Sequence, residues 1–194
     1  MLTIAKSDDI AASAALIAEV LRQPGAVALV PTETVYGLIC RANDCAAVSE
    51  IVRLKHRVAG KFFGWFVRDC DVAKKFGLIF SDTAENLAEE YFPGAVTLIL
   101  PTINGTTQAV RIPDHPLIKA LLEYFDEPLV QTSANASGMP DALSLEQALV
   151  QLDGEPNVAC DGGILPSDAS GSTVVNVAEN PPKILRQGKV VVKL

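Results

Sequence analysis

Residues 26–38 read AVALVPTETVYGL, in which a run of small and β-branched residues is followed by a polar turn. The apolar run predicts a buried strand, and TETVYGL predicts the turn that leads out of it. Upstream, residues 8–22 repeat apolar positions at helical spacing, with Ser7 or Asp8 as the candidate N-cap and a Pro-Gly pair as the stop. A helix, a buried strand and a polar turn therefore follow one another here.

The same alternation continues along the chain. Apolar periodicity predicts further helices at residues 45–54, 84–92, 115–125 and 144–152. Further strands are predicted at residues 64–69, 93–102, 110–113, 129–135, 157–163, 172–178 and 183–194. In the stretch 93–102, Pro93 and Gly94 form the turn that enters the strand. The alternation predicts a compact α/β fold, and we expect one domain over residues 1–194. Because the last strands follow one another without helices, part of the sheet should be antiparallel or mixed.

Composition and charge narrow the class of protein. The apolar share of 49% is ordinary for a soluble globular protein, and no apolar run is long enough to span a bilayer. The N-terminal residues lack a cleavable-signal pattern, so we expect a cytosolic protein. The net charge of −7 argues against a dedicated nucleic-acid binder. The four cysteines form no C-x-x-C pair and the chain has two histidines, so no metal site is expected.

Polar clusters follow several predicted strands, at the positions where α/β sheets usually bind ligands. Thr32 and its neighbours either form a plain turn, with Gly37 at positive φ, or line a pocket. The loop QTSANASG, residues 131–138, is rich in small hydroxyl and amide groups, which allow close approach to a phosphate or a ribose. Without further context this loop is either a turn or a binding site.

Basic residues form the second kind of candidate. Lys55, His56 and Arg57, with Lys61 beyond them, either complete a helix end or supply the cations that a triphosphate needs. Arg111 lies between apolar neighbours, so it is either on an exposed face or buried beside an anionic partner such as a substrate carboxylate. The chain has no Walker loop, dinucleotide fingerprint or nucleophile elbow, so a nucleotide would be bound in another way.

Seven sequence pieces occur in a set order between residues 26 and 188: PTETVYGL, KHR with Lys61, PGAVTLIL, VRIPDHP, QTSANASG, SGSTVVNV and ILRQG. Each piece alone is unspecific. Together and in this order they resemble the YrdC/TsaC family of threonylcarbamoyl-adenylate synthases, in its short, single-domain form. The resemblance implies a twisted mixed sheet with flanking helices and a concave ligand-binding face.

The resemblance also implies roles for the matching positions. The catalytic cations would be Lys55 and Arg57. The positions that would bind ATP are Lys55, Arg57, Lys61, Thr107, Ser133, Asn135 and Arg186. The positions that would bind threonine are Thr32, Arg111, Gln131 and Ser172, with Arg111 taking the amino-acid carboxylate.

The reaction that the resemblance implies is a nucleotidyl transfer. L-threonine, bicarbonate and ATP, with Mg²⁺ on the phosphates, would give threonylcarbamoyl-AMP and pyrophosphate. The product would pass to downstream tRNA-modifying proteins, which use it to modify an adenosine, and tRNA itself is a candidate partner. No residue in the seven pieces is an obvious covalent nucleophile, so we expect catalysis by positioning and electrostatics.

One stretch departs from the family pattern. Residues 58–66 lack the proline that usually follows the K-x-R signature, and Phe66 stands where one branch has a histidine that contacts threonine. This departure favours a first alternative, a paralogue with a different acyl-adenylate or phosphate chemistry. A second alternative is a non-catalytic RNA-binding module, in which the basic cluster grips a phosphate backbone. The net charge and the intact pair Ser133 and Asn135 argue against it.

Overall fold

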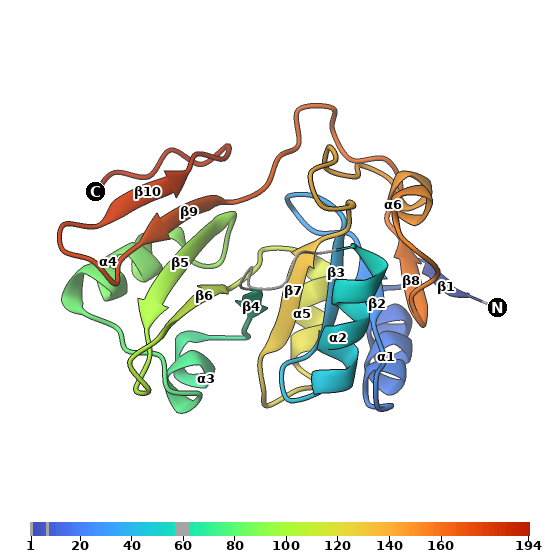
Figure 1. Cartoon of the computed structure of the whole chain (residues 1–194), viewed down its shortest axis with the longest axis horizontal. Helices are drawn as coiled ribbons and strands as arrows, with labels where there is room; N and C mark the ends of the chain where they lie inside the picture. Colours follow the sequence, from blue (N-terminus) through green and yellow to red (C-terminus); the bar gives the residue numbers. More distant parts are fainter. Residues whose placement is uncertain (1, 7, 57–62) are drawn as a thin grey trace.

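The computed structural model describes residues 2–6, 8–56 and 63–194. Its strands are β1 (Thr3–Lys6), β2 (Ala28–Val30), β3 (Gly37–Arg41), β4 (Gly64–Phe66), β5 (Val96–Pro101), β6 (Thr107–Arg111), β7 (Leu129–Ser133), β8 (Val158–Asp161), β9 (Thr173–Asn176) and β10 (Lys183–Arg186). Its helices are α1 (Ile10–Leu21), α2 (Cys45–Leu54), α3 (Cys70–Lys75), α4 (Asp82–Tyr91), α5 (Pro116–Leu122) and α6 (Leu145–Gln151). Figure 1 shows their arrangement.

The strands of the described residues form one mixed sheet, in the order β1-β8-β2-β3-β7-β4-β6-β5-β9-β10. The pairs β1/β8, β2/β8, β4/β6 and β5/β9 are parallel. The other neighbouring pairs are antiparallel. This arrangement confirms the predicted α/β fold with a mixed sheet and flanking helices.

Helices cover the two faces of the sheet unequally. On one face, α1 and α5 pack together over the half from β1 to β7 and bury side chains such as Ile17 and Ile118. On the opposite face, α2 and α6 cover that half, and α3 and α4 cover the other half. The apolar side chains beneath α2 and α6 are continuous with those beneath α3 and α4. The register explains this, because Val130, Trp65 and Val110 are direct cross-strand neighbours on the same side of the sheet.

Strands and loops, rather than helices, line the α1/α5 face over β4, β6, β5 and β9. The register brings Gln131, Gly64 and Ala109 into one row on this part of the face. A Cβ at Gly64 would lie 2.3 Å from Gln131 Nε2, so the glycine leaves room for the Gln131 side chain. The fold therefore keeps one area of the sheet open to polar side chains.

Short polar side chains determine where the helices begin. The residues Asp9, Asp44, Asp69, Ser81 and Ser144 precede α1, α2, α3, α4 and α6, and each accepts a hydrogen bond from the backbone N–H three residues on. For α1 the cap is Asp9, which accepts from Ala12 N at 3.0 Å, so the prediction of Asp8 was wrong. Ser7, the other candidate cap, lies outside the described residues.

Gly37 does not lie in the turn where the sequence placed it. It begins β3, pairs with Val30 and Ser133, and is not among the glycines with positive φ. Its α-carbon lies close to a neighbouring strand, because a Cβ there would be 3.2 Å from the carbonyl oxygen of Thr132. The glycine is therefore explained by close packing between strands rather than by an unusual backbone angle.

Other boundaries also differ from the predictions. The strand expected at residues 110–113 runs over β6 and stops before Pro113, which has no N–H to donate to a ladder. The strand expected at residues 183–194 is limited to β10. Two short elements, β1 and α3, were not predicted, because four and six residues are too few to show a clear period.

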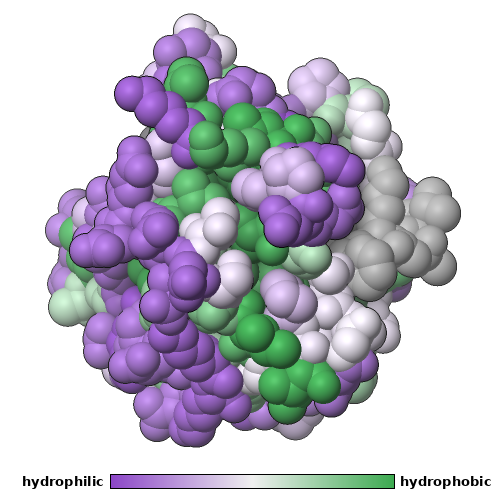
Figure 2. Space-filling view, turned by 90° about the vertical axis from the view of Figure 1, so that its left-hand side faces the viewer, coloured by the Kyte–Doolittle hydropathy of each residue, from purple (hydrophilic) through white to green (hydrophobic). Residues whose placement is uncertain are grey.

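The surface is mixed in character. Figure 2 shows the end of the molecule that carries α4 and β10, where hydrophobic residues form a band between hydrophilic ones. Ile184 and Leu185 of β10 are among the exposed hydrophobic side chains. Among the described residues, none of the helices combines the length and the apolar character that crossing a bilayer requires.

Candidate functional site

A cavity of about 270 Å³ opens over the strand-and-loop part of the sheet. Its lining comes from segments far apart in the sequence: Thr34, Val35, Gly64, Thr97, Ala109, Arg111, Gln131, Thr132, Ser133, Asp141, Gly171, Ser172, Val174 and Arg186. Five of the residues selected from the sequence are among them: Arg111, Gln131, Ser133, Ser172 and Arg186. Members of the expected threonine set and of the expected ATP set thus border one cavity.

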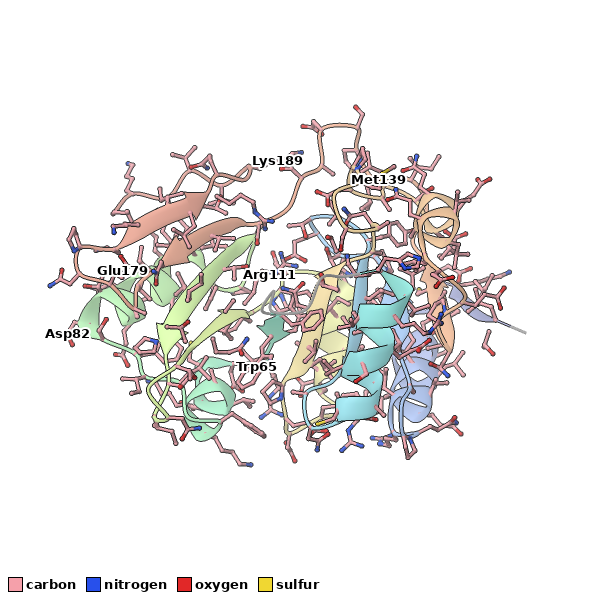
Figure 3. The ribbon with its side chains drawn as sticks, in the orientation of Figure 1. Trp65, Asp82, Arg111, Met139, Glu179 and Lys189 are labelled. Carbon is pink, nitrogen blue, oxygen red and sulfur yellow. The ribbon has the colours of Figure 1, made fainter. Side chains whose placement is uncertain are left out.

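Arg111 is the most deeply buried cation of this cavity, at 3% exposure. Its Nη1 donates to Thr34 Oγ1 at 3.2 Å, its Nε lies 3.6 Å from Glu33 Oε1, and its guanidinium carbon lies 4.8 Å from the centre of the Phe66 ring. Burial lowers the pKa of Arg111, and the Glu33 carboxylate opposes that shift. Figure 3 shows Arg111 near the centre of the molecule. Arg111 is therefore buried, and its protein partner is Glu33.

Arg186 reaches the cavity from the edge strand β10. Its Nε donates to the carbonyl oxygen of Ser172 at 2.9 Å and its Nη2 to Ser172 Oγ at 3.3 Å. Ser172 Oγ also bonds Thr97 Oγ1 at 2.7 Å. Both Arg111 and Arg186 line the cavity, and the charge of Arg186 further lowers the pKa of Arg111. Two cations at one cavity favour an anionic ligand.

Lys55 connects the end of α2 to the loop of residues 131–138. Lys55 is buried, with 2% of the residue exposed, and its Nζ donates to the carbonyl oxygen of Ser133. The Lys55 carbonyl oxygen in turn accepts from Ser137 N at 3.2 Å. The basic cluster and the hydroxyl-amide loop therefore meet in space. The predicted partners Arg57 and Lys61 lie outside the described residues.

The loop of residues 131–138 is held by its own side chains. Ser133 Oγ donates to Asn135 Oδ1 at 2.5 Å, and Asn135 Nδ2 donates to the carbonyl oxygen of Met139 at 2.5 Å. Asn135 is buried, and the N–H of the preceding residue, Ala134, donates to the carbonyl oxygen of Tyr36 at 2.8 Å. These bonds fix the Ser133 hydroxyl at the rim of the cavity.

Thr32 and Thr107, two of the selected residues, are not among the lining residues. Thr32 Oγ1 donates to the carbonyl oxygen of Val35 at 2.7 Å, and it bonds Thr34 Oγ1 at 2.9 Å. Thr32 thus shapes the turn, while Thr34 is among the cavity's lining residues. Thr107 is exposed at the start of β6, on the same side of the strand as Arg111 but about 13 Å along it at 3.3 Å per residue.

Sequence reasoning missed Glu33, Thr34, Thr97 and Asp141. The first two belong to the quoted stretch PTETVYGL, and their polar character was the available signal. Thr97 gave no signal, because a threonine within a strand is common. Asp141 follows the selected loop by three residues and contributes the carboxylate among the cavity's lining residues.

A larger cavity, of about 570 Å³, lies between α3, α4 and α5, but its chemistry is less suited to a polar ligand. Apolar side chains such as Phe80 and Leu122 contribute to its lining. Several of its charged residues are paired with protein groups, as in Lys74 with Glu85 at 2.8 Å. Convergent polar groups that await a partner are the better sign of a binding site, and these are at the smaller cavity.

A sequence-family model, Sua5_yciO_yrdC, described as "Telomere recombination", matches residues 19–188. The chain belongs to this family. The Sua5/YciO/YrdC fold is also found by structural comparison: Escherichia coli YciO superposes with a TM-score of 0.82 at 24% identity, covering 100% of this chain and 98% of that one. At that identity the likeness concerns the fold alone.

Two relatives of the Sua5/YciO/YrdC family carry functional names. The threonylcarbamoyl-AMP synthase of Bacillus subtilis is 34% identical over 183 residues, which cover 89% of this chain and 52% of that protein. The crystal structure of Pyrococcus abyssi Sua5 complexed with L-threonine has a TM-score of 0.81 at 30% identity, covering 96% of this chain and 57% of that one. The chain thus spans about half the length of the curated relatives it matches first.

Proposed function

We propose that this protein is an L-threonylcarbamoyladenylate synthase, a nucleotidyltransferase that makes threonylcarbamoyl-AMP and pyrophosphate from L-threonine, bicarbonate and ATP. One observation carries the proposal. A single cavity is bordered by a buried guanidinium, Arg111, and by the loop around Ser133 that contacts Lys55. A carboxylate-binding group and a phosphate-binding group are thus close enough to serve two substrates that must react with each other.

Arg111 would bind the carboxylate of L-threonine. A buried guanidinium attracts a planar carboxylate strongly, because both groups lose competing water and their geometries match. Gln131 and Ser172, which line the same cavity, would bond the rest of the amino acid. Thr34 would take the place that the sequence had suggested for Thr32, since Thr34 lines the cavity and its hydroxyl accepts from Arg111.

The phosphate end would lie toward Lys55 and the loop of residues 131–138. Ser133 and Asn135 would approach the nucleotide, while Arg57 and Lys61 would add charge on the phosphates. Arg186 lines the cavity between the two ends and fits a role beside the nucleotide. We keep Thr107 as a candidate for the outer part of ATP, because it shares the sheet face of Arg111.

The reaction needs positioning more than covalent chemistry. The amine of threonine forms a carbamate, either with bicarbonate, from which water leaves, or with CO₂, in which case the amine releases a proton. A carbamate oxygen then attacks the α-phosphorus of ATP, and the bond from that phosphorus to pyrophosphate breaks. Charge that develops on the leaving pyrophosphate must be neutralised, and Lys55 and Arg57 are the residues we assign to this task. Bound substrates would also have to keep water from a labile carbamate.

A magnesium ion would be carried mainly by ATP itself. No group of three or more His, Cys, Asp or Glu side chains suited to a metal ion is present in the described part of the chain. The cavity offers the carboxylate of Asp141. One carboxylate together with substrate phosphates is a common ligand set for Mg²⁺, so Asp141 would hold the ion on the protein side.

The product would be handed to tRNA-modifying proteins, with tRNA itself as a further candidate partner. Residues 1–194 would act as one catalytic domain in the cytosol, where ATP and bicarbonate are available. The continuous sheet supports a single working unit, because strands from both ends of the chain belong to it.

The test is pyrophosphate release with each substrate left out in turn. We expect release that requires L-threonine, bicarbonate and ATP together. In the double variant Lys55→Ala with Arg57→Ala, the rate should fall by about 10² or more, the loss typical of removing groups that stabilise transition-state charge. The matched control is Lys75→Ala, an exposed lysine of α3 that should leave the rate unchanged.

Three outcomes would contradict the proposal. A double variant as fast as the wild type would refute the assigned cations. Release that depends on another amino acid or acid would favour a paralogue with different acyl-adenylate chemistry. No release and no ATP binding, with RNA affinity that falls steeply with salt, would indicate an RNA-binding module instead.

A further inference from the structure

Three buried polar atoms without hydrogen-bond partners lie behind the cavity. In the described residues they are Glu33 Oε2, Arg111 Nε and His115 Nδ1. Buried polar atoms are nearly always bonded, so three unbonded ones on neighbouring side chains need an explanation. Two of them are of opposite character, a carboxylate oxygen and a guanidinium N–H, on groups whose closest atoms are 3.6 Å apart.

Glu33 joins two segments that are far apart in the sequence. It belongs to the turn after β2, and its Oε1 accepts from Asp114 N at 3.2 Å. Asp114 belongs to the segment that leads from β6 to α5. The same oxygen is the one that faces Arg111 Nε. Glu33 therefore sets the position of the Arg111 guanidinium relative to the turn.

The surroundings of Arg111 leave one direction open. Glu33 faces its Nε, Thr34 Oγ1 accepts from its Nη1, and the Phe66 ring covers one face of the group. Its Nη2 bonds to none of the described residues, and Arg111 lines the cavity. A carboxylate that binds two N–H groups of a guanidinium needs the group held in a defined plane.

The charges around Arg111 also indicate that Glu33 supports its guanidinium group. Burial and the nearby Arg186 both lower the pKa of Arg111, and the Glu33 carboxylate acts against them. Without Glu33 the guanidinium would be a buried cation with no protein counter-charge at its side, which is costly. A carboxylate beside Arg111 also repels a second negative charge, and it repels a dianion more than a monoanion.

We infer that Glu33 is the positioning residue of Arg111: it orients the guanidinium toward the cavity and reserves that end for a monoanionic carboxylate rather than a phosphate. The inference rests on the proposed function, in which Arg111 binds the carboxylate of L-threonine. It goes further by explaining how the two substrates take opposite ends of a cavity that has cations at both. The amino acid binds beside Glu33, and the phosphates bind away from it.

The test compares Glu33→Gln, Glu33→Asp and the control Glu155→Gln, an exposed glutamate before β8, by calorimetric titration. The titrants are L-threonine, L-threoninol, which lacks the carboxylate, and ATP. In Glu33→Gln we expect the Kd for L-threonine to rise about tenfold, on the order of one charge-assisted contact, while the Kd values for L-threoninol and ATP stay the same. Glu33→Asp, which keeps the charge, should recover part of the loss.

Inorganic phosphate supplies a readout that a purely structural role would not change. It should compete with L-threonine in Glu33→Gln and not in the wild type or in Glu155→Gln. Equal L-threonine affinity in Glu33→Gln and wild type, or an equal loss for L-threoninol, would overturn the inference. If Glu33→Gln does not fold, the same comparisons are made with Glu33→Ala, which also removes the charge and should give the same results. A wild type that binds no L-threonine would overturn the proposed function, and this inference with it.

Discussion

Adding one methyl group at Gly64 tests how tightly the floor of the cavity is built. In Gly64→Ala the new Cβ would lie 2.3 Å from Gln131 Nε2 and 3.3 Å from its Cδ. Because contacts below 3.0 Å are essentially never seen for a real Cβ, the Gln131 amide must move. Gln131 lines the cavity, so the displaced amide and the methyl group both change its shape.

The effect on stability should be small, because two terms nearly cancel. Replacing a glycine that has ordinary φ stabilises a protein by about 0.4–1 kcal/mol, since the unfolded chain loses freedom. Moving a flexible amide out of its preferred rotamer costs about 0.5–1.5 kcal/mol. The net change should be within about 1 kcal/mol, which corresponds to a shift in Tm of about 2–4 °C for a chain of this size.

The effect on ligand binding should be larger. We expect the Kd for L-threonine to rise about tenfold in Gly64→Ala, measured by calorimetry, because the amide that we assign to the amino acid is displaced. In the Gln131→Ala background, where the clash is gone, the same methyl group should have little further effect. The coupling between the two positions should be about 1 kcal/mol or more, as for residues in direct contact. Equal, additive losses in both backgrounds would refute the close contact on which this reasoning depends.

Two further predictions concern titration and reactivity. Burial lowers the pKa of His115 below 6.5, so the unfolded chain binds more protons than the folded one near that pH, and the unfolding free energy should fall as the pH drops below 6.5. Thermal melts of wild type and His115→Gln across about pH 5 to 7.5 check this, and the variant should lose less stability in acid; identical slopes would contradict it. Burial raises the pKa of Cys40 to about 12 and that of Cys160 to about 11, while Cys45 is exposed, so a thiol reagent at about pH 8 should modify Cys45 first. A fast phase that persists in Cys45→Ser would show that another thiol is accessible.

Much of the fold could be predicted from local patterns. The helix at residues 45–54 has the predicted bounds, and its cap, Asp44, is the kind of residue that begins helices. For residues 93–102 a turn at Pro93 and Gly94 followed by a strand was predicted, and β5 begins at Val96, just after that pair. The short elements β1 and α3 were missed, since β1 is held by pairing with β8, a strand more than 150 positions away.

The candidate site was predictable only in part. Its hydroxyl, amide and basic residues stand out in the sequence because they interrupt apolar runs. Whether Arg111 is buried could not be deduced from its neighbours, and neither could its pairing with Glu33. The sequence also selected Thr32, whose hydroxyl is bonded within its own turn, whereas Thr34, two positions on, is among the residues that line the cavity. Thr32 and Thr34 are only two positions apart in an irregular turn. Because such a turn has no repeating side-chain period, the sequence does not indicate which of the two threonines reaches the cavity.

The amino-acid sequence itself decided the helix starts, the buried strands, the α/β class and the order of the seven sequence pieces. These features depend on propensities and periods that act over a few residues. The tertiary structure alone decided which side chains meet. Arg111 bonds Thr34 across 77 positions, and Lys55 bonds Ser133 across 78. Such contacts depend on strand order and register, which follow from the burial of the whole sheet, so they exist only once the chain has folded.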